Sequence, residues 1–261
     1  TIIKELGSII FRDPELVDIN DKYSGFVTSE EYLSGNVKKK LITAFNYKNS
    51  YPTLGFEKNV KALEEVQPPP LKATEIAVRL GASWIDTKIY KDFLVETLDI
   101  PYYYASGIDV FYNKHDSSYR VDLTANYVRG FRSQKIASLS TSRASAFRLF
   151  EDSLNLKSTS IYDTIEVDGK EKRVLNKEET IAAREKQNRI KDMFKEWIFK
   201  DPERRDMLEE TYNNLFNQIR LPTYNGSYLR FPEMNPTITL KDHQKDAVHR
   251  IITSGNTLLH H

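Results

Sequence analysis

The stretch NKEETIAAREKQNRIKDMFKEWIFKDP, residues 176–202, decides the fold class. Its apolar residues recur at i, i+3, i+4, i+7 and i+8, which places them on one face of a helix. They are Ile190, Met193, Phe194, Trp197 and Ile198. Asn176 suits the cap that begins this helix, and Asp201-Pro202 ends it and begins another. The next helix repeats the spacing, so we expect the two helices to be antiparallel and packed through their apolar faces.

Two β-hairpins are predicted before this helix. Apolar and polar residues alternate over 108–112 and again over 119–123, with a polar loop between them. Asp168-Gly169 suits a turn that needs positive φ, and it lies between the strand-like runs 161–167 and 172–175. Residues 143–154, between the hairpins, have helical spacing. The sequence therefore predicts an α+β fold that is mainly helical with two β-hairpins.

The first third of the chain is also predicted to be helical. Thr28 with Glu31 forms a capping box for a helix that Gly35-Asn36 interrupts, and residues 56–66 form a second helix. Three prolines at 68–70 cannot continue it and mark a linker. Beyond them we expect two short helices, 73–80 and one beginning near Thr87, around Gly81. We expect a plain helical hairpin there, because Thr87 occupies a place where a helix-turn-helix needs an aliphatic residue.

The composition excludes several classes of protein. The chain has 261 residues and no Cys, which excludes disulfides, thiolate nucleophiles and cysteine metal sites. Its apolar runs are too short to span a bilayer. It begins at Thr1 rather than Met, and no signal peptide follows. We therefore expect an internal piece of a longer, cytoplasmic protein.

The net charge of +1 conceals a basic middle segment. Residues 128–200 carry 16 basic and 11 acidic side chains, a net charge of +5. Between Leu123 and Phe150 no acidic residue occurs. The basic residues of that interval are Arg129, Arg132, Lys135, Arg143 and Arg148. Such a segment favours a polyanion, because phosphate contacts release condensed counterions. The alternative is a solvated face with five scattered charges.

No catalytic or metal-binding pattern is present in the sequence. His243 and His249 are six residues apart, which does not match the four-residue spacing of a helical metal pair. No HExxH, no glycine-rich phosphate loop and no grouping of Ser, His and acid occurs. We therefore expect neither a catalytic residue nor a metal site in this chain.

The end of the chain carries the element LKDHQ, residues 240–244, ahead of a helix at 245–253 and a strand-like run at 257–259. This order resembles the entry to the motor core of superfamily 2 helicases and translocases. In that family a glutamine before the first helix reads the adenine edge, and Gln244 is the position that matches. An amide suits this task because it offers both a donor and an acceptor. An ordinary surface glutamine is the other interpretation, and the five residues alone do not separate the two.

The resemblance extends over nearly the whole chain. Its blocks include YLSGNV (32–37), RVLNKEET (173–180), WIFKDPERR (197–205), YNGS (224–227) and FPEMNP (231–236). They occur in the order found in the very long DNA methyltransferase–helicase proteins of bacterial conjugative elements and phages. The resemblance implies ATP-driven remodelling of DNA by a Swi/Snf-like, DEAD/DEAH-type motor, with a DNA adenine methyltransferase domain upstream. ATP and Mg would then belong to the parent motor, S-adenosylmethionine to the parent methyltransferase, and no cofactor to this fragment.

The prolines and the resemblance together predict three segments. We expect an N-terminal helical segment at residues 1–67 and an α+β connector or DNA-binding domain at 71–236, and the resemblance implies that 237–261 is the truncated start of the helicase motor. The favoured function is a non-catalytic connector that binds the DNA backbone through the five basic residues, between the helicase and methyltransferase domains of one parent chain. The alternative is a structural or protein-interaction spacer that docks onto the motor without DNA. The run Tyr102-Tyr103-Tyr104 would serve docking, the core or base stacking.

Overall fold

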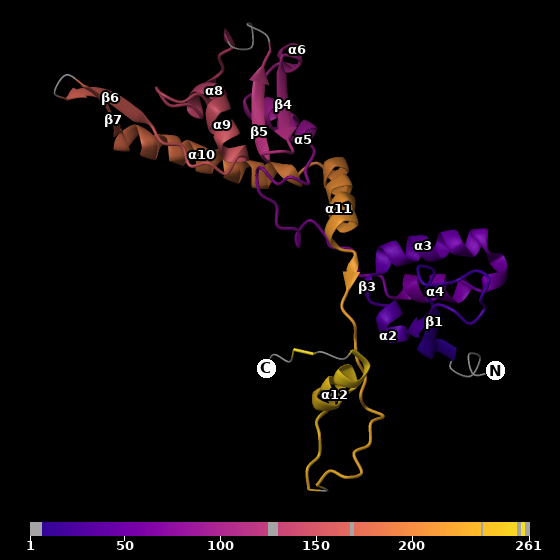
Figure 1. Ribbon diagram of the computed structural model, residues 1–261. Coiled ribbons are helices and arrows are strands. Elements are labelled where there is room, and N and C mark those ends of the chain that lie inside the picture. Colours follow the sequence, from indigo (N-terminus) through magenta and orange to yellow (C-terminus); the bar gives the residue numbers. More distant parts are fainter. Residues whose placement is uncertain (1–6, 125–129, 168–169, 236, 255–256, 259–261) are drawn as a thin grey trace. The chain divides into compact units, whose positions relative to one another are not determined.

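A computed structural model describes residues 7–124, 130–167, 170–235, 237–254 and 257–258. The chain divides into two compact units (Figure 1). The central unit comprises residues 71–213, and the terminal unit comprises residues 1–70 together with 214–261. Helices account for 47% of the structure and strands for 14%, which confirms the predicted α+β, mainly helical class.

The central unit contains both predicted hairpins and most of the long helices. Its elements are α5 (Thr87–Thr97), α6 (Tyr102–Ala105), β4 (Ile108–Asn113), β5 (Ser118–Leu123), α8 (Gln134–Ser138), α9 (Ala146–Leu154), β6 (Tyr162–Val167), β7 (Lys170–Leu175), α10 (Lys177–Ile198) and the start of α11 (Pro202–Phe216). Asn176 caps α10 as expected, because its side-chain oxygen accepts a hydrogen bond from the Glu179 N–H at 3.0 Å.

Aromatic rings form the centre of this unit's core. Phe194 of α10 is fully buried, and its ring centroid lies 5.1 Å from that of Phe93 and 5.7 Å from that of Tyr90, both on α5. Burying such a ring contributes about 1.5–3 kcal/mol. The apolar face of α10 packs against α5 and α9. These contacts fix α9, and with it the loop that precedes α9, on the long helix.

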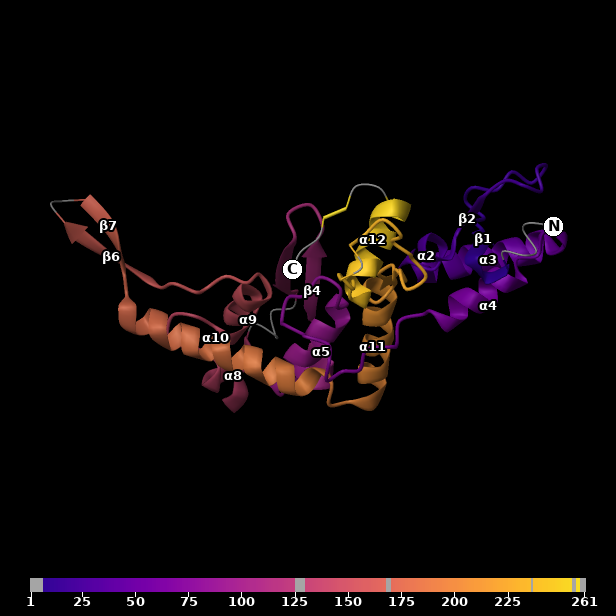
Figure 2. The same cartoon turned by 90° about the horizontal axis from the view of Figure 1, so that it is seen from below.

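Both hairpins are confirmed. In the first, Ile108 pairs with Leu123 and Tyr112 with Tyr119, as the alternation indicates. In the second, β6 pairs with β7 from Tyr162↔Leu175 to Val167↔Lys170, and the Asp168-Gly169 turn lies outside the described residues. The second hairpin extends from the first turns of α10, away from the rest of the central unit (Figures 1 and 2). Every residue of β7 is exposed.

The helix predicted at residues 73–80 does not form. Ile76 and Leu80 are buried, yet the backbone runs through turns. Side chains of α11 hold its start: Glu209 accepts from the Ala73 N–H at 2.7 Å, and Asn213 Oδ1 accepts from the Leu71 N–H at 2.8 Å. Those N–H groups would lack a partner at a helix start as well, so the two bonds anchor the start of the segment to α11. The expected helical hairpin is therefore absent, and Gly81 has positive φ without ending a helix.

The predicted packing of α10 against α11 is also wrong. The apolar face of α10 is occupied by α5 and α9. Of the apolar residues on α11, Leu208 is buried, whereas Leu215 and Phe216 are 53% and 55% exposed. At the junction, the Arg204 guanidinium lies 3.4 Å above the Trp197 ring and donates hydrogen bonds to the carbonyl oxygens that end α10.

The terminal unit is built around a small helical pair. It contains η1 (Gly7–Ile9), β1 (Ile10–Arg12), β2 (Phe26–Thr28), α2 (Ser29–Tyr32), β3 (Gly35–Asn36), α3 (Val37–Ser50), η2 (Pro52–Leu54), α4 (Glu57–Glu65), β8 (Ile219–Arg220) and α12 (Asp242–Ser254). Thr28 caps α2 as predicted, since its side-chain oxygen accepts from the Glu31 N–H. Phe11 stacks on Tyr32 at 5.2 Å, and Val60 and Leu63 of α4 complete this core.

The pairing of β3 with β8 joins segments far apart in the sequence. Gly35 pairs with Arg220 and Asn36 with Ile219, so residues after 213 belong to the same unit as the N-terminal helices. The sequence-based division into 1–67, 71–236 and 237–261 agrees with the two units at the boundary near residue 70. It differs from them beyond Asn213, because residues 214–236 belong to the terminal unit.

Candidate nucleic-acid interface

A basic pocket of about 770 Å³ lies in the central unit between α8, α9 and the end of β5. Two arginines, Arg132 and Arg143, line it, and no acidic residue does. Its remaining lining residues are Leu123, Ser133, Ile136, Ala137, Ser140, Thr141, Ser142, Ala144, Ser145 and Phe147. The pocket therefore combines two guanidinium groups with a hydroxyl-rich loop over an apolar floor.

Hydroxyl groups fix the loop that forms one wall of this pocket. Ser145 caps α9 by accepting from the Arg148 N–H at 3.3 Å. Ser140 accepts from the Ala146 N–H at 2.9 Å and donates to the Ile136 carbonyl at 2.7 Å, which ties the start of α9 to α8. Thr141 accepts from the Ala144 N–H at 3.0 Å. These bonds satisfy backbone groups that a helix start leaves unpaired, and they hold the arginines on a defined frame.

Arg143 is held at the pocket by an ion pair with the second hairpin. Its Nη1 donates to Asp163 Oδ1 at 2.7 Å, and its Nη2 donates to the Tyr162 carbonyl at 3.1 Å. The hydrogen bond from Arg143, with a second from Asn176, lowers the pKa of Asp163 from its usual 3.8. Both members of the pair are partly exposed, and an exposed pair contributes about 0–1 kcal/mol. A phosphate can therefore compete with Asp163 for the guanidinium.

A cluster of tilted aromatic rings ends one residue before Arg132. The Tyr103 ring lies 4.6 Å from the Tyr104 ring, which lies 4.8 Å from the Phe131 ring, next in the chain to Arg132. Tyr102 and Tyr103 are 93% and 69% exposed. The tyrosine run is thus divided, because Tyr104 packs against the core while its two neighbours face solvent. Exposed rings beside cations suit the bases and phosphates of a nucleic-acid strand.

The other predicted basic residues lie apart from this pocket. Lys135, on α8, lines a separate hollow of about 280 Å³ that also contains Glu96, Glu196 and Trp197. Arg148, on α9, is exposed and lies 4.0 Å from Asp152. Arg129 lies outside the described residues. The structure therefore brings together two of the five, Arg132 and Arg143, and places Lys135 and Arg148 elsewhere on the two helices.

The serines and threonine of the pocket were not singled out from the sequence. The signal was present as the run SLSTSRAS, residues 138–145, which concentrates hydroxyl groups beside Arg143. A hydroxyl-rich run between two helices is common in loops, so composition alone does not separate a ligand site from a set of helix caps. Here the hydroxyls act mainly as caps and loop bonds, and the two arginines remain as the charged groups that face a ligand.

Gln244 lies in the terminal unit at the start of α12. Its side chain is exposed, and its Oε1 accepts a hydrogen bond from the Lys241 N–H at 2.9 Å. The amide oxygen thus closes the first turn of the helix. The strand-like run after α12 is 87% exposed at Leu258, and Leu259 lies outside the described residues. Nucleotide reading by Gln244 stays a prediction.

The block YNGSY, residues 224–228, anchors the helix that carries Gln244. The Gly226 N–H donates to Asp246 Oδ1 at 2.7 Å. The Tyr228 hydroxyl and His249 Nδ1 share a hydrogen bond of 2.8 Å, and the His249 ring is 5% exposed. A Cβ on Gly226 would overlap the Lys245 backbone. These interactions give a structural role to a block that the sequence singled out only by its resemblance.

Two absences hold for the described part of the chain. Among the described residues, no group of three or more His, Asp or Glu side chains is arranged to hold a metal ion. None of the helices described has the length and apolar character that a membrane crossing requires.

Comparison with known proteins adds one match. Residues 79–218 match the family described as "Domain of unknown function (DUF8437)". No curated protein and no solved structure matches the chain. The matched range contains the basic pocket, the aromatic cluster of Tyr103, Tyr104 and Phe131, and both hairpins.

Proposed function

The chain belongs to the family described as "Domain of unknown function (DUF8437)", and we propose that it acts as a non-catalytic connector that binds the phosphate backbone of DNA. The observation that carries this proposal is the basic pocket, in which Arg132 and Arg143 meet without an acidic lining residue. Phosphate contacts position a protein on DNA and carry no sequence information. The expected binding is therefore non-specific.

The surroundings of the pocket support a strand as its ligand. The loop bonds of Ser140 and Ser145 fix the backbone that carries Arg143, so that little loop ordering remains for the binding step. The exposed Tyr103 ring, in the aromatic cluster that ends at Phe131, offers a face on which a base could stack without sequence preference. Charge and stacking together favour a nucleic acid over a small anion.

The resemblance to methyltransferase–helicase proteins supplies the wider proposal. In it, the helicase and methyltransferase domains of the same parent chain are the partners, and the cytoplasm is the compartment. ATP and Mg serve the motor, and S-adenosylmethionine serves the methyltransferase. Gln244 would meet adenine through its side-chain NH₂ group, because its oxygen is held by the Lys241 N–H.

Titration of a labelled duplex at two salt concentrations tests DNA binding. We expect the 261-residue chain to bind at about 50 mM salt and to lose affinity as salt rises. Replacing both arginines (Arg132→Ala with Arg143→Ala) should weaken binding equally for unrelated sequences. It should also reduce the slope of log K against log salt by about 1.8, because each phosphate that an arginine neutralises contributes about 0.9. The matched control replaces Arg79 and Arg189, two exposed arginines of the central unit that do not line the pocket.

The control pair changes the net charge by the same amount. It should therefore reproduce only the small effect of total charge. Equal losses of affinity for the two double variants would show that the pocket is not where DNA binds. Undetectable binding at about 50 mM salt would overturn the DNA role altogether.

A second variant tests Arg143 from the opposite direction. Asp163→Asn removes the carboxylate that pairs with Arg143 while keeping a side chain of similar shape. DNA affinity should then rise, since the guanidinium no longer has to leave an anion and a negative charge next to the site is gone. In the Arg143→Ala background the gain should shrink, because only the long-range part of the charge effect is left.

The spacer function has one supporting observation of its own. Ile251 and Ile252 of α12 are 47% and 66% exposed, so this helix offers apolar surface to a neighbouring domain. A pull-down of the separate helicase motor, unchanged by added DNA, would support the spacer function. Loss of that pull-down in an Ile252→Lys variant would locate the docking surface on α12.

A further inference from the structure

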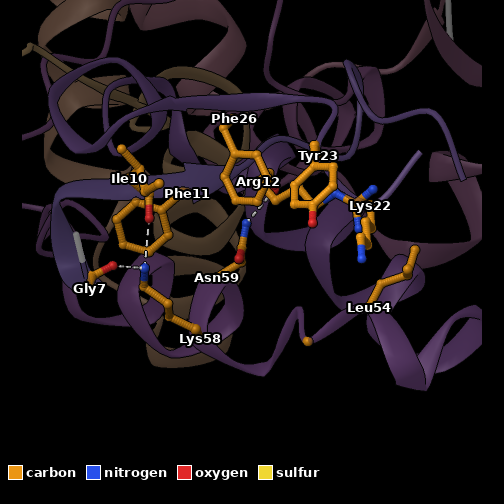
Figure 3. A pocket seen from close by; sticks show the side chains of 11 residues that line it. Gly7, Ile10, Phe11, Arg12, Lys22, Tyr23, Phe26, Leu54, Lys58 and Asn59 are labelled. Carbon is orange, nitrogen blue, oxygen red and sulfur yellow. Dashed lines mark hydrogen bonds between the residues drawn. The ribbon is translucent and has the colours of Figure 1, made fainter. Parts of the chain in front are cut away.

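A second pocket, of about 600 Å³, lies in the terminal unit between β1, β2 and the start of α4 (Figure 3). It is separate in sequence and structure from the basic pocket of the central unit. Its lining residues are Gly7, Ile10, Phe11, Arg12, Lys22, Tyr23, Phe26, Leu54, Gly55, Lys58 and Asn59. Three of these are cations, three are aromatic and none is acidic. Its volume is that of a small-molecule site and is far larger than a single phosphate requires.

Two of the cations, Arg12 and Lys58, donate their hydrogen bonds to uncharged backbone carbonyls. Arg12 is 8% exposed, and its guanidinium donates to three backbone carbonyls: Ser24 at 3.1 Å, Asp18 at 3.2 Å and Asp21 at 2.6 Å. Lys58 Nζ donates to the carbonyls of Ile10, at 2.6 Å, and Gly7. Carbonyl oxygens satisfy the N–H groups but do not cancel the charges.

Nearby carboxylates are engaged in turns. Asp18 Oδ1 accepts from the Asn20 N–H, and Asp21 Oδ1 accepts from the Tyr23 N–H, each at 2.9 Å. Within the described part of the chain, neither Arg12 nor Lys58 forms an ion pair. Burial accordingly lowers the pKa of Lys58. Arg12 is a buried charge without a counterion, and Lys58, though exposed, has no counterion either, so an anion in this pocket gains from both cations.

Aromatic rings supply the other half of the pocket. Tyr23 is 66% exposed, and Lys22 Nζ lies 4.8 Å from the centre of its ring. Figure 3 shows the Tyr23 ring beside Lys22, on the side of the pocket opposite Lys58. Phe26 also lines the pocket, and the Arg12 guanidinium lies 6.0 Å from its ring centre. The exposed Tyr23 ring offers a face on which a flat ring can stack.

We propose that this pocket binds a nucleotide, with its phosphate at Lys58 and its base against Tyr23 on the opposite side of the pocket. Inorganic phosphate would leave the aromatic wall unused, and a neutral aromatic compound would leave the cations without a counterion. A nucleotide carries both features at the separation that a 600 Å³ pocket allows. The same chemistry occurs in a free nucleotide and in the end of a DNA strand, so the test must distinguish these sources.

The test uses the 261-residue chain and calorimetric titration with AMP, ADP and ATP. Adenosine and inorganic phosphate serve as the two half-ligands. Tyr23→Ala and Lys58→Ala alter exposed side chains, so the fold should persist, and each should weaken nucleotide binding about tenfold. Lys48→Ala is the matched control, since Lys48 also lies over an aromatic ring, that of Phe45, in the same unit but outside the pocket. The Lys48→Ala variant should bind nucleotides with unchanged affinity.

The source of the nucleotide is resolved with a 5′-phosphorylated single-stranded oligonucleotide. This arm uses the Arg132→Ala, Arg143→Ala background, which removes the basic pocket of the central unit. A strand end is supported if the oligonucleotide binds at least tenfold more tightly than AMP and loses that advantage in Tyr23→Ala. A free nucleotide is supported if only AMP, ADP or ATP responds to Tyr23→Ala.

Three results would overturn the inference. They are no binding of any nucleotide at millimolar concentration, phosphate binding as tightly as AMP, and equal effects of Tyr23→Ala and Lys48→Ala. None of these outcomes bears on DNA binding by the central unit. Failure of the two proposals is therefore distinguishable.

Discussion

Replacing Gly81 with alanine tests whether the central unit depends on one close backbone approach. Gly81 has φ of +87°, a region that alanine adopts only with strain. A Cβ at this position would overlap the carbonyl oxygen of Leu154 and lie 2.9 Å from its carbonyl carbon. Leu154 ends α9, and its side chain is 1% exposed. The new methyl group therefore meets backbone rather than a flexible side chain.

Hydrogen bonds hold the backbone next to Gly81 in place. Next to Gly81, the Ala82 carbonyl accepts hydrogen bonds from the Tyr90 hydroxyl at 2.8 Å and the Tyr119 hydroxyl at 3.3 Å. Left-handed backbone costs an L-residue about 1–2 kcal/mol. Overpacking in a dense core costs about 1–3 kcal/mol more. The expected loss in free energy of unfolding is therefore roughly 2–5 kcal/mol, a large part of the roughly 5–15 kcal/mol that holds a domain together.

Urea denaturation followed by tryptophan fluorescence measures this loss. Both tryptophans, Trp84 and Trp197, lie in the central unit, so their signal reports on that unit alone. With an m-value of about 2 kcal/mol/M, the midpoint should fall by about 1–2.5 M. Gly130→Ala is the control, because a Cβ there meets no atom within 4 Å and no positive φ is involved. A midpoint for Gly81→Ala equal to that of Gly130→Ala would refute the reasoning.

Three further predictions follow from the same unit. Asn155→Ala should cost about 1–3 kcal/mol in urea denaturation, because the Asn155 side chain bonds both the N–H of Tyr119, at 2.7 Å, and its carbonyl, at 2.8 Å. Phe194→Ala should cost about 3–5 kcal/mol in the same assay, since this ring is fully buried among other rings. Asp163 should titrate in carboxyl NMR below 3.8 and return toward that pKa in Arg143→Ala. Because the folded-state pKa is the lower one, the stabilisation by this pair is present above pH 3.8 and is lost as the pH falls through the lowered pKa.

Elements with local signals were predictable from the sequence. The α10 helix is determined by its own spacing and by the Asn176 cap, and neither requires a distant partner. The first hairpin follows from alternation, since Ile108 and Val110 face the core while Phe111 is exposed. Period, caps and turn residues are properties of neighbouring residues, so they survive in any tertiary context.

Elements that depend on distant partners were not predictable. Residues 73–80 have helical spacing, but Glu209 and Asn213 supply backbone hydrogen bonds at the start of this segment, across 136 and 142 residues of chain. Likewise β3 is only two residues long and exists because β8, beyond residue 218, pairs with it. A local pattern carries no information about such a partner, and tertiary context overrides weak helix propensity.

The candidate site shows the same division. The absence of acidic residues between Leu123 and Phe150 indicated the basic region, but not which cations share a pocket. That depends on α8 and α9 meeting through Ser140 and on the hairpin bringing Asp163 to Arg143. The pocket of the terminal unit gave no sequence signal, because Arg12, Lys22 and Lys58 are ordinary in number and far apart in the chain.

The family match bears differently on the two pockets. It covers residues 79–218, nearly the range of the central unit, and so includes Arg132, Arg143 and the exposed tyrosines. A role common to the family has to be carried out by residues inside this range. The nucleotide pocket is formed by residues 7–59 and lies wholly outside it. DNA binding by the basic pocket is therefore the activity to seek in other members, whereas nucleotide binding should depend on whether a member also carries a terminal unit of this kind. Assaying the two activities across members would separate a property of the domain from a property of this chain.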